Sequence, residues 1–169
     1  LKDPKEPIER FFTEAEGLGK KFNCCLWQFP KSFIKKDETL GRLDTFLSNL
    51  PKTVKQVFEF RDTSWFTEDV FSLLNTYSAG FVLNDSSVFP EIEAVTDSIV
   101  YIRFHGTKQW YRHNYTKEEL QVWVQRIFEN NPKRVWAYFN NDREGYAIKN
   151  AKVFLRLLKK QDAIKPNPT

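Results

Sequence analysis

The sequence contains no methionine and only two cysteines among its 169 residues. Because an intact translation product normally begins with methionine, we expect the chain to be a piece of a longer protein or a processed chain. Its first residues, LKDPKEP, lack the apolar core of a signal peptide. No apolar run approaches the roughly 20 residues that span a bilayer. With no sign of export or of a membrane partner, we expect a cytoplasmic protein.

The two cysteines are adjacent, at Cys24 and Cys25. Neighbours in a strand point to opposite faces, so they do not readily form a disulfide with each other. A metal site would need further ligands. We therefore interpret both as small buried hydrophobic residues in a reducing compartment.

The composition is that of a folded domain. Hydrophobic residues make up 41% of the chain and aromatic residues 16%, which is enough for a core and excludes a disordered segment. The net charge of +4 favours anionic partners but falls short of a polybasic nucleic-acid-binding protein. The length fits one domain, which we expect over residues 1–160, with a frayed tail at residues 161–169.

Helical and strand patterns alternate along the chain. The predicted strands are KFNCCLWQF, KQVFEFR, GFVLND, SIVYIRFHG and RVWAYFNN, and a helical pattern follows each of them. One helix has a capping box, Thr116 and Glu119, ahead of its apolar face. This alternation predicts an α/β fold with a parallel sheet. No strand is followed by a glycine-rich phosphate loop, so no fingerprint supports an open sheet, but periodicity alone does not decide between open sheet and barrel.

Polar residues gather where the strands end, in EFRDTSW, LNDSS, RFHGTKQ and FNNDREG. In parallel α/β proteins the chemistry lies at the carboxyl ends of the strands. Residues two apart in a strand share a face, so Glu59 and Arg61 point one way and Phe58 and Phe60 the other. Burying charge is costly unless it is paired and hydrogen-bonded. We therefore expect this strand to carry an unusual structural site or a functional one.

The segments VFEFRDTSW, VLND, YIRFHG and WAYFNND, followed by GYAIKNA, resemble in order and spacing the YecE-like proteins, a family of TIM-barrel proteins of unknown function. CLWQFPKSF resembles the family's glutamine-proline strand end, with Phe29 where another apolar type is usual. The resemblance covers nearly the whole chain and implies a parallel (β/α) TIM-type barrel, of which these are the last five of eight βα units. The N-terminal barrel segment is missing, so we expect a longer protein or a complementary segment to supply it. The resemblance implies no established reaction.

Strand parity predicts which side chains share the barrel interior. If Phe58, Phe60, Ile102 and Phe104 face the helices, the alternate residues face inward. Near one mouth this gathers Gln28, Glu59, Arg61, Asp85, Arg103, His105 and Asn140. Barrel interiors are normally layered with branched apolar side chains, so these charges favour a functional site. The alternative is an internal ion-pair network that only fills the interior. We expect Glu59 to pair with Arg103.

The residue types favour an enzyme that acts on a small carboxylated or phosphorylated anion by acid/base chemistry, although the sequence does not establish catalysis. Arginines grip planar anions through paired hydrogen bonds. His105 is the candidate acid or base, with Glu59 or Asp85 to orient it or to act as the base, although a strand-end histidine that only bonds a neighbour is an alternative. The ligand-binding candidates are Arg61, Arg103, Gln28, Asn140, Asn141 and Tyr115. We predict no cofactor.

Two alternatives belong to other classes. Glu59, Asp85 and His105 are suitable ligands for a divalent metal, as in a metal-dependent hydrolase, although neighbouring arginines would repel the cation. The loop at 105–117 interleaves aromatic and basic residues, as in HGTKQWYRHNYTK, and could bind single-stranded nucleic acid. The mild net charge favours a lid over the barrel mouth for this loop instead.

Overall fold

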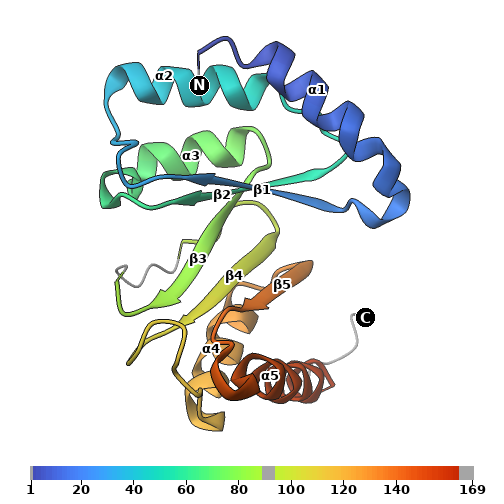
Figure 1. The fold of residues 1–169 in the computed structure, drawn as a ribbon, viewed down its shortest axis with the longest axis vertical. Coiled ribbons are helices and arrows are strands. Elements are labelled where there is room, and N and C mark those ends of the chain that lie inside the picture. Colours follow the sequence, from blue (N-terminus) through green and yellow to red (C-terminus); the bar gives the residue numbers. More distant parts are fainter. Residues whose placement is uncertain (1, 89–93, 164–169) are drawn as a thin grey trace. The chain divides into compact units, whose positions relative to one another are not determined.

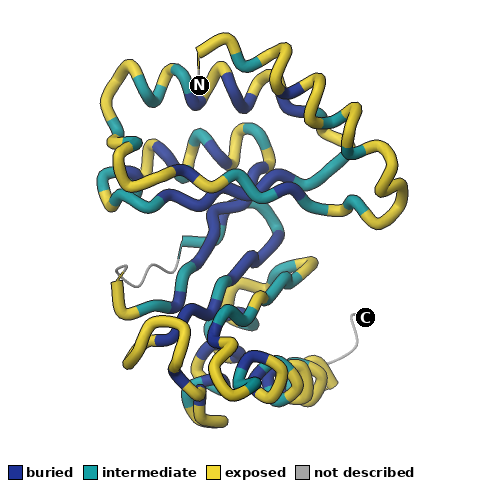
Figure 2. Tube along the Cα trace, viewed as in Figure 1, coloured by how far each residue is buried: buried dark blue, intermediate teal, exposed yellow. Residues whose placement is uncertain are grey.

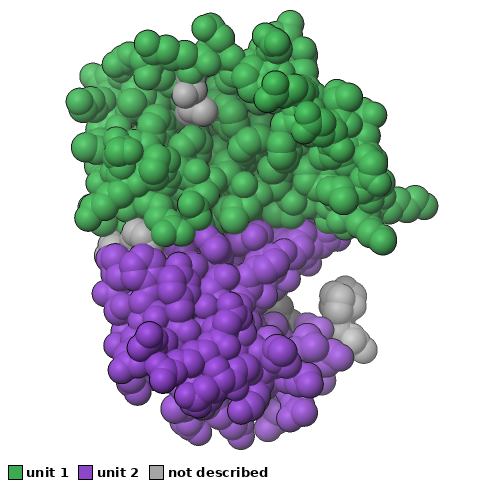
Figure 3. Space-filling view, in the orientation of Figure 1, with its two compact units in different colours: residues 1–82 green, residues 83–169 purple. Residues whose placement is uncertain are grey.

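Strands and helices alternate along the chain, as the sequence pattern predicts, in a computed structural model that describes residues 2–88 and 94–163. The chain divides into two compact units, residues 1–82 and residues 83–169, coloured green and purple in Figure 3. The boundary falls within strand β3 (Gly80–Ser86). Each unit is described by itself below.

The first unit holds three helices and two strands ahead of β3. These are α1 (Lys5–Ala15), β1 (Cys24–Phe29), α2 (Asp37–Ser48), β2 (Lys55–Phe60) and α3 (Glu68–Thr76), with 3-10 turns at Glu16–Lys21 and Thr63–Trp65. The three helices lie on one side of the β1–β2 pair (Figure 1). Aromatic side chains fill this layer: the ring of Phe58 lies 6.3 Å from that of Phe46 on α2, and Phe60 stacks on Trp65 at 4.8 Å.

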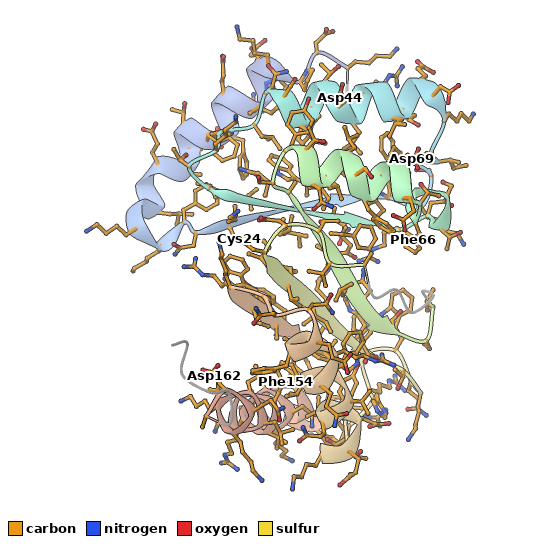
Figure 4. All side chains as sticks on the ribbon, turned by 180° about the vertical axis from the view of Figure 1, so that it is seen from behind. Cys24, Asp44, Phe66, Asp69, Phe154 and Asp162 are labelled. Carbon is orange, nitrogen blue, oxygen red and sulfur yellow. The ribbon has the colours of Figure 1, made fainter. Side chains whose placement is uncertain are left out.

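The second unit holds β4 (Ile99–Gly106), α4 (Lys117–Glu129), β5 (Arg134–Phe139) and α5 (Tyr146–Asp162), with a 3-10 turn at Arg143–Gly145. Phe104 of β4 is fully buried, and its ring contacts Trp123 of α4 at 5.9 Å and Phe154 of α5 at 5.2 Å. Phe154 is labelled on α5 in Figure 4. The helices therefore cover the Phe104 face of this strand, which leaves Arg103 and His105 on the opposite face.

The strands pair in chain order, from β1 to β5. The β1–β2, β2–β3 and β4–β5 pairs are parallel, with Gln28 opposite Glu59 and Arg103 opposite Tyr138. Dark blue runs through β2, β3 and β4 in Figure 2, so these strands are buried along most of their length. The predicted α/β class, with a parallel sheet ordered as the sequence, is confirmed.

Local sequence signals explain where elements begin. The Thr116 hydroxyl accepts a hydrogen bond from the Glu119 N–H at 3.2 Å, and the Glu119 carboxylate accepts one from the Thr116 N–H at 2.8 Å. This is the predicted capping box, and it satisfies two N–H groups at the start of α4. Of the predicted tail at 161–169, residues 161 and 162 belong to α5, and residues 164–169 lie outside the described residues.

The cysteines are both free thiols, and Cys24 opens β1 (Figure 4). Burial raises the pKa of Cys24 to about 11 and that of Cys25 to about 12. Thiols with such pKa values carry little thiolate at neutral pH, so neither is a ready nucleophile. Among the described helices, none combines the length and the apolar character that crossing a bilayer requires.

Candidate functional site

The ends of β1 and β2 carry a three-residue polar cluster, formed by Gln28 of β1, Glu59 of β2 and Arg61, which follows β2. The Arg61 Nε–H donates to Glu59 Oε1 at 2.8 Å, and Arg61 Nη2 donates to Gln28 Oε1 at 2.9 Å. Glu59 is fully buried, whereas the Arg61 side chain keeps 20% of its surface exposed. The guanidinium therefore provides the paired charge that a buried carboxylate requires.

Glu59 has an ion-pair partner two residues along the chain. Arg61 makes an ion pair with this carboxylate, and we expected Arg103 of β4 as its partner. Arg103 belongs to the other unit, so its pairing with Glu59 stays a prediction.

His105 lies on the face of β4 opposite Phe104, and only 1% of its surface is exposed. Its ring meets the Tyr111 ring edge-on, with centroids 5.6 Å apart, and its carbonyl accepts a hydrogen bond from the Tyr111 N–H at 2.6 Å. A side chain of the following loop therefore covers the candidate acid or base. The role of His105 in proton transfer stays a prediction.

Asp85 points toward helix α4. Its carboxylate accepts hydrogen bonds from the Trp123 Nε1–H of α4 and from the Tyr115 hydroxyl, the latter at 3.1 Å. Burial raises the pKa of Asp85, and these two hydrogen bonds only partly oppose the rise. Asp85 therefore faces the helix layer, and its expected place near one barrel mouth with the other charged residues stays a prediction. Any catalytic role for it stays a prediction.

Tyr115 anchors the loop that follows β4. Its hydroxyl accepts a hydrogen bond from the Gly106 N–H at 2.8 Å while it donates to Asp85. Its backbone is also held, because the Tyr115 N–H donates to Asn150 Oδ1 at 3.2 Å and Asn150 Nδ2 donates back to the Tyr115 carbonyl at 3.0 Å. Only 4% of Tyr115 is exposed, so the side chain fixes the loop and presents little surface to a ligand.

Asn141, which follows β5, also holds the backbone of this loop by hydrogen bonds. Its Nδ2 donates to the His113 carbonyl and to Asn150 Oδ1, both at 2.7 Å, and the residue is fully buried. Asn141 and Tyr115, both expected as ligand-binding residues, hold the backbone between β4 and α4 in this structure. A ligand contact through either one stays a prediction.

Gly106 allows the loop to turn back on itself. Its φ is +99°, where L side chains are strained, and an added Cβ would lie 2.6 Å from the Gln109 carbonyl oxygen and 2.8 Å from His113 Cβ. No side chain fits in that space without backbone movement. The glycine in RFHG is therefore required by the loop geometry.

Glu119 ties two basic side chains of the loop to α4. It lies 3.0 Å from His113 Nε2 and 3.3 Å from Lys108 Nζ. Burial raises the pKa of Glu119, but hydrogen bonds from the Thr116 N–H and from His113 outweigh it and bring the pKa below its usual range. Two of the basic groups that suggested nucleic-acid binding are therefore engaged within the unit.

An open pocket of about 570 Å³ lies where β4 and β5 end. It is lined by Tyr111, Arg112, Asn140, Asp142 and Arg143. Tyr111 and Arg112 belong to the loop that Tyr115 anchors, and the other three directly follow β5. Guanidinium groups at strand carboxyl ends suit an anion, and this volume lies within the range of about 300–1,000 Å³ typical of small-molecule sites.

The metal alternative has no support from a local cluster. Across residues 2–88 and 94–163, no group of three or more His, Cys, Asp or Glu side chains is arranged to hold a metal ion. Glu59 belongs to the first unit and Asp85 and His105 to the second, so their joint use as metal ligands stays a prediction.

The whole chain matches one known protein family. A family model described as "Protein of unknown function DUF72" matches residues 1–169. The chain belongs to the DUF72 family. This confirms the expected kinship with proteins of unknown function.

Two solved structures of DUF72 family proteins share this fold. A crystal structure of a DUF72 family protein from Thermotoga maritima MSB8 is 29% identical, with a TM-score of 0.83 over 94% of this chain and 66% of that one. A second, from Enterococcus faecalis V583, is 21% identical, with a TM-score of 0.79 over 100% of this chain and 70% of that one.

A curated relative, the UPF0759 protein YunF of Bacillus subtilis strain 168, is 26% identical over 82% of this chain. The chain spans 58% of the length of YunF and 66% of the Thermotoga structure. It therefore corresponds to less than two thirds of either relative.

Several structural residues of this DUF72 chain were not expected as part of the site. Trp123 lies on the apolar face that follows the Thr116 capping box, and no sequence signal assigns its N–H to Asp85. Asn150 was not singled out at all. Arg112 was expected only among the basic residues of the 105–117 loop, and Arg143 only as part of the polar strand end FNNDREG.

Proposed function

We propose that this chain forms the last five of eight βα units of a TIM-type barrel of the YecE-like kind, and that it contributes a binding site for a small carboxylated or phosphorylated anion. The barrel proposal is supported by the parallel strands in chain order and by the greater length of the relatives. In such barrels the loops after the strands build the site.

The pocket between the loops after β4 and β5 carries the functional proposal. Arg112 and Arg143 both line it, so two cationic groups border one cavity at the carboxyl ends of adjacent strands. A guanidinium offers a planar set of N–H donors that matches the geometry of a carboxylate or phosphate. Arg103 shares the inward face of β4 with His105 and stays a further ligand candidate, as does Arg61 in the first unit.

His105 is the candidate acid or base of this site. It is buried behind Tyr111, which itself lines the pocket, so a ligand that displaces the Tyr111 ring would meet the imidazole next. Exclusion of water strengthens electrostatic interactions at such a position. The proposal is therefore an enzyme that binds an anion and moves a proton at His105.

The test is a thermal-shift panel on the whole protein that carries this chain, with phosphate, sulfate, acetate and citrate as probes. We expect at least one anion to raise the melting temperature of the wild type and to have a much smaller effect on the variant Arg112→Gln/Arg143→Gln. Arg156→Gln is the matched control, because Arg156 is exposed on α5 and lies outside the pocket. An anion that stabilises all three proteins equally, or no stabilising anion, would remove the proposal.

A second candidate is supported by the exposed aromatic pair in the same loop. Trp110 and Tyr111 are 37% and 45% exposed and stack on each other at 5.2 Å. Single-stranded nucleic acid binds to such rings through its bases and to basic groups through its phosphates. An oligonucleotide titration at low and high salt separates the candidates: strongly salt-dependent binding that Trp110→Ala abolishes would favour nucleic acid over a small anion.

A further inference from the structure

We propose that the pocket between the β4 and β5 loops takes a phosphorylated, polyhydroxylated small molecule such as a sugar phosphate, and this rests on the anion site proposed above. The charges around the pocket give the first reason. Arg112 makes no side-chain hydrogen bond or ion pair within the described part of the chain, and Arg143 pairs only with Glu144, at 3.4 Å. Arg112 is therefore available to a phosphate, and Arg143, whose Nε faces Glu144, keeps its two Nη groups for a ligand.

The second reason is the carboxylate in the same pocket. Asp142 is exposed, and its side chain makes no hydrogen bond or ion pair with any residue in the described ranges. A bare phosphate or sulfate would be repelled by this group. A ligand that carries hydroxyl groups beside its phosphate can donate hydrogen bonds to the carboxylate while the arginines hold the anion.

The third reason is an aromatic ring and the volume beside it. Tyr111 lines the pocket with 45% of its surface exposed. An aromatic ring combines an apolar body with a polar tip, which suits the mixed C–H and O–H surface of a carbohydrate. The volume of about 570 Å³ also accommodates more than an inorganic anion.

Backbone geometry on both sides of the pocket supports a built site. Tyr111 has φ of 63° and Glu144, next to Arg143, has φ of 55°, both in the left-handed region that non-glycine residues rarely occupy. Such strain is kept where the surrounding structure enforces it, and it concentrates at functional sites. The anchored loop holds Tyr111 in this conformation through the bond from its N–H to the His105 carbonyl.

A zwitterion such as an amino acid is the competing ligand, because its ammonium group would also pair with Asp142. The residues that line the pocket are two arginines and one aspartate among the charged ones, a formal charge of +1, while Glu144, which pairs with Arg143, lies outside the lining. This balance favours a net anion over a net-neutral zwitterion. A direct measurement of binding affinity for a sugar phosphate and for an amino acid distinguishes the two ligand types.

The experiment is calorimetric titration of the whole protein with ribose 5-phosphate, ribose, inorganic phosphate and alanine. We expect ribose 5-phosphate to bind about tenfold or more tightly than any of the other three. Asp142→Asn should reduce the advantage of ribose 5-phosphate over inorganic phosphate, and it should tighten phosphate binding because the repelling carboxylate is gone. Arg112→Gln should weaken the binding of both ligands. The control Arg156→Gln should change neither.

The outcomes separate this inference from the anion site beneath it. Equal binding of phosphate and ribose 5-phosphate, or an unchanged preference in Asp142→Asn, would overturn the sugar-phosphate inference and keep the anion site. Tighter binding of alanine would overturn it in favour of a zwitterion. Failure of both phosphate and ribose 5-phosphate to bind would remove this inference, and the thermal-shift panel then decides whether a carboxylate occupies the anion site.

Discussion

Each unit buries one carboxylate near the end of a strand, and the two are satisfied in different ways. Glu59, in the first unit, is fully buried and forms an ion pair with Arg61. Asp85, in the second, is 6% exposed and accepts hydrogen bonds from the neutral donors of Trp123 and Tyr115. A cation balances the first carboxylate directly, whereas burial dominates the second and raises its pKa.

The two units also differ in whether an arginine side chain is already hydrogen-bonded. Arg61 already bridges Glu59 and Gln28 within the first unit. Arg112, in the second unit, lines a pocket and makes no side-chain bond within the described residues. In the first unit, Arg61 is engaged with the buried Glu59 carboxylate. In the second unit, neutral donors from Tyr115 and Trp123 bind Asp85 and hold the loop after β4, and Arg112 of that loop is exposed.

The largest effect should come from breaking the ion pair of the first unit. Arg61→Leu leaves the Glu59 carboxylate buried without this partner, and we expect it to lower the free energy of unfolding by about 3 kcal/mol, the low end of the range because Arg61 is 20% exposed. Urea denaturation of the whole protein measures this. The double variant Glu59→Gln/Arg61→Leu should recover part of this loss, because it removes the buried charge as well. If Arg61→Leu alone costs no more than the loss of an exposed ion pair, the Arg61 pair does not stabilise the buried Glu59 carboxylate.

Removing a neutral donor from Asp85 should have a smaller effect. Trp123→Phe keeps an aromatic ring on α4 but deletes the N–H that donates to Asp85, and we expect a loss of about 1–3 kcal/mol in the free energy of unfolding. Trp110→Phe is the matched control, since Trp110 is 37% exposed, and it should stay within about 0.5 kcal/mol of the wild type. Equal losses for the two variants would show that the Asp85 bond contributes nothing.

The raised pKa of Asp85 predicts a pH dependence of stability. Below its ordinary pKa of 3.8, Asp85 is protonated in both folded and unfolded chains. As the pH rises above that value, the unfolded chain ionises first, so the folded state loses relative stability until the pH passes the raised pKa. Thermal melts from about pH 3 to about pH 7 should show wild-type stability falling relative to Asp85→Asn. A constant or rising difference would contradict the burial effect.

The smallest effect should come from an exposed ion pair. Lys108 is 71% exposed and lies 3.3 Å from Glu119. Lys108→Gln should change the free energy of unfolding by about 0–1 kcal/mol, and less at high salt, because exposed pairs are screened by solvent and ions. Chemical denaturation at low and high salt checks this. A loss as large as that of Arg61→Leu would show that exposure does not distinguish the two pairs.

Much of the fold could be predicted from local patterns. Alternating strand and helix periodicity predicts the five strands and their parallel order because each pattern reports which side of an element is buried. The parity rule also placed Phe58 and Phe104 toward helices correctly, since charged and aromatic residues alternate in these strands. The same rule puts Arg61 beside Glu59, so the observed ion pair was within reach of the sequence.

The orientation of Asp85 was beyond the sequence for a physical reason. The strand GFVLND is apolar on both faces, so its pattern does not show which residues point toward α4. The donors to Asp85 come from Tyr115 and Trp123, which are 30 and 38 residues away along the chain. Contacts over such separations depend on how the loop and helix pack, and no local pattern encodes them.

By itself, the sequence determined the α/β class, the parallel strand order, the capping box at Thr116 and Glu119, and the polar character of the strand ends, because these depend on local spacing and side-chain type. Only the tertiary structure decided which polar groups are bound internally and which face a pocket. Tyr115 and Arg112 lie in one short loop with similar sequence surroundings, yet one is buried in a hydrogen-bond network and the other lines the pocket. That difference arises from burial. A buried polar group requires hydrogen-bond partners within the protein, whereas an exposed one is solvated by water and remains free to bind a ligand.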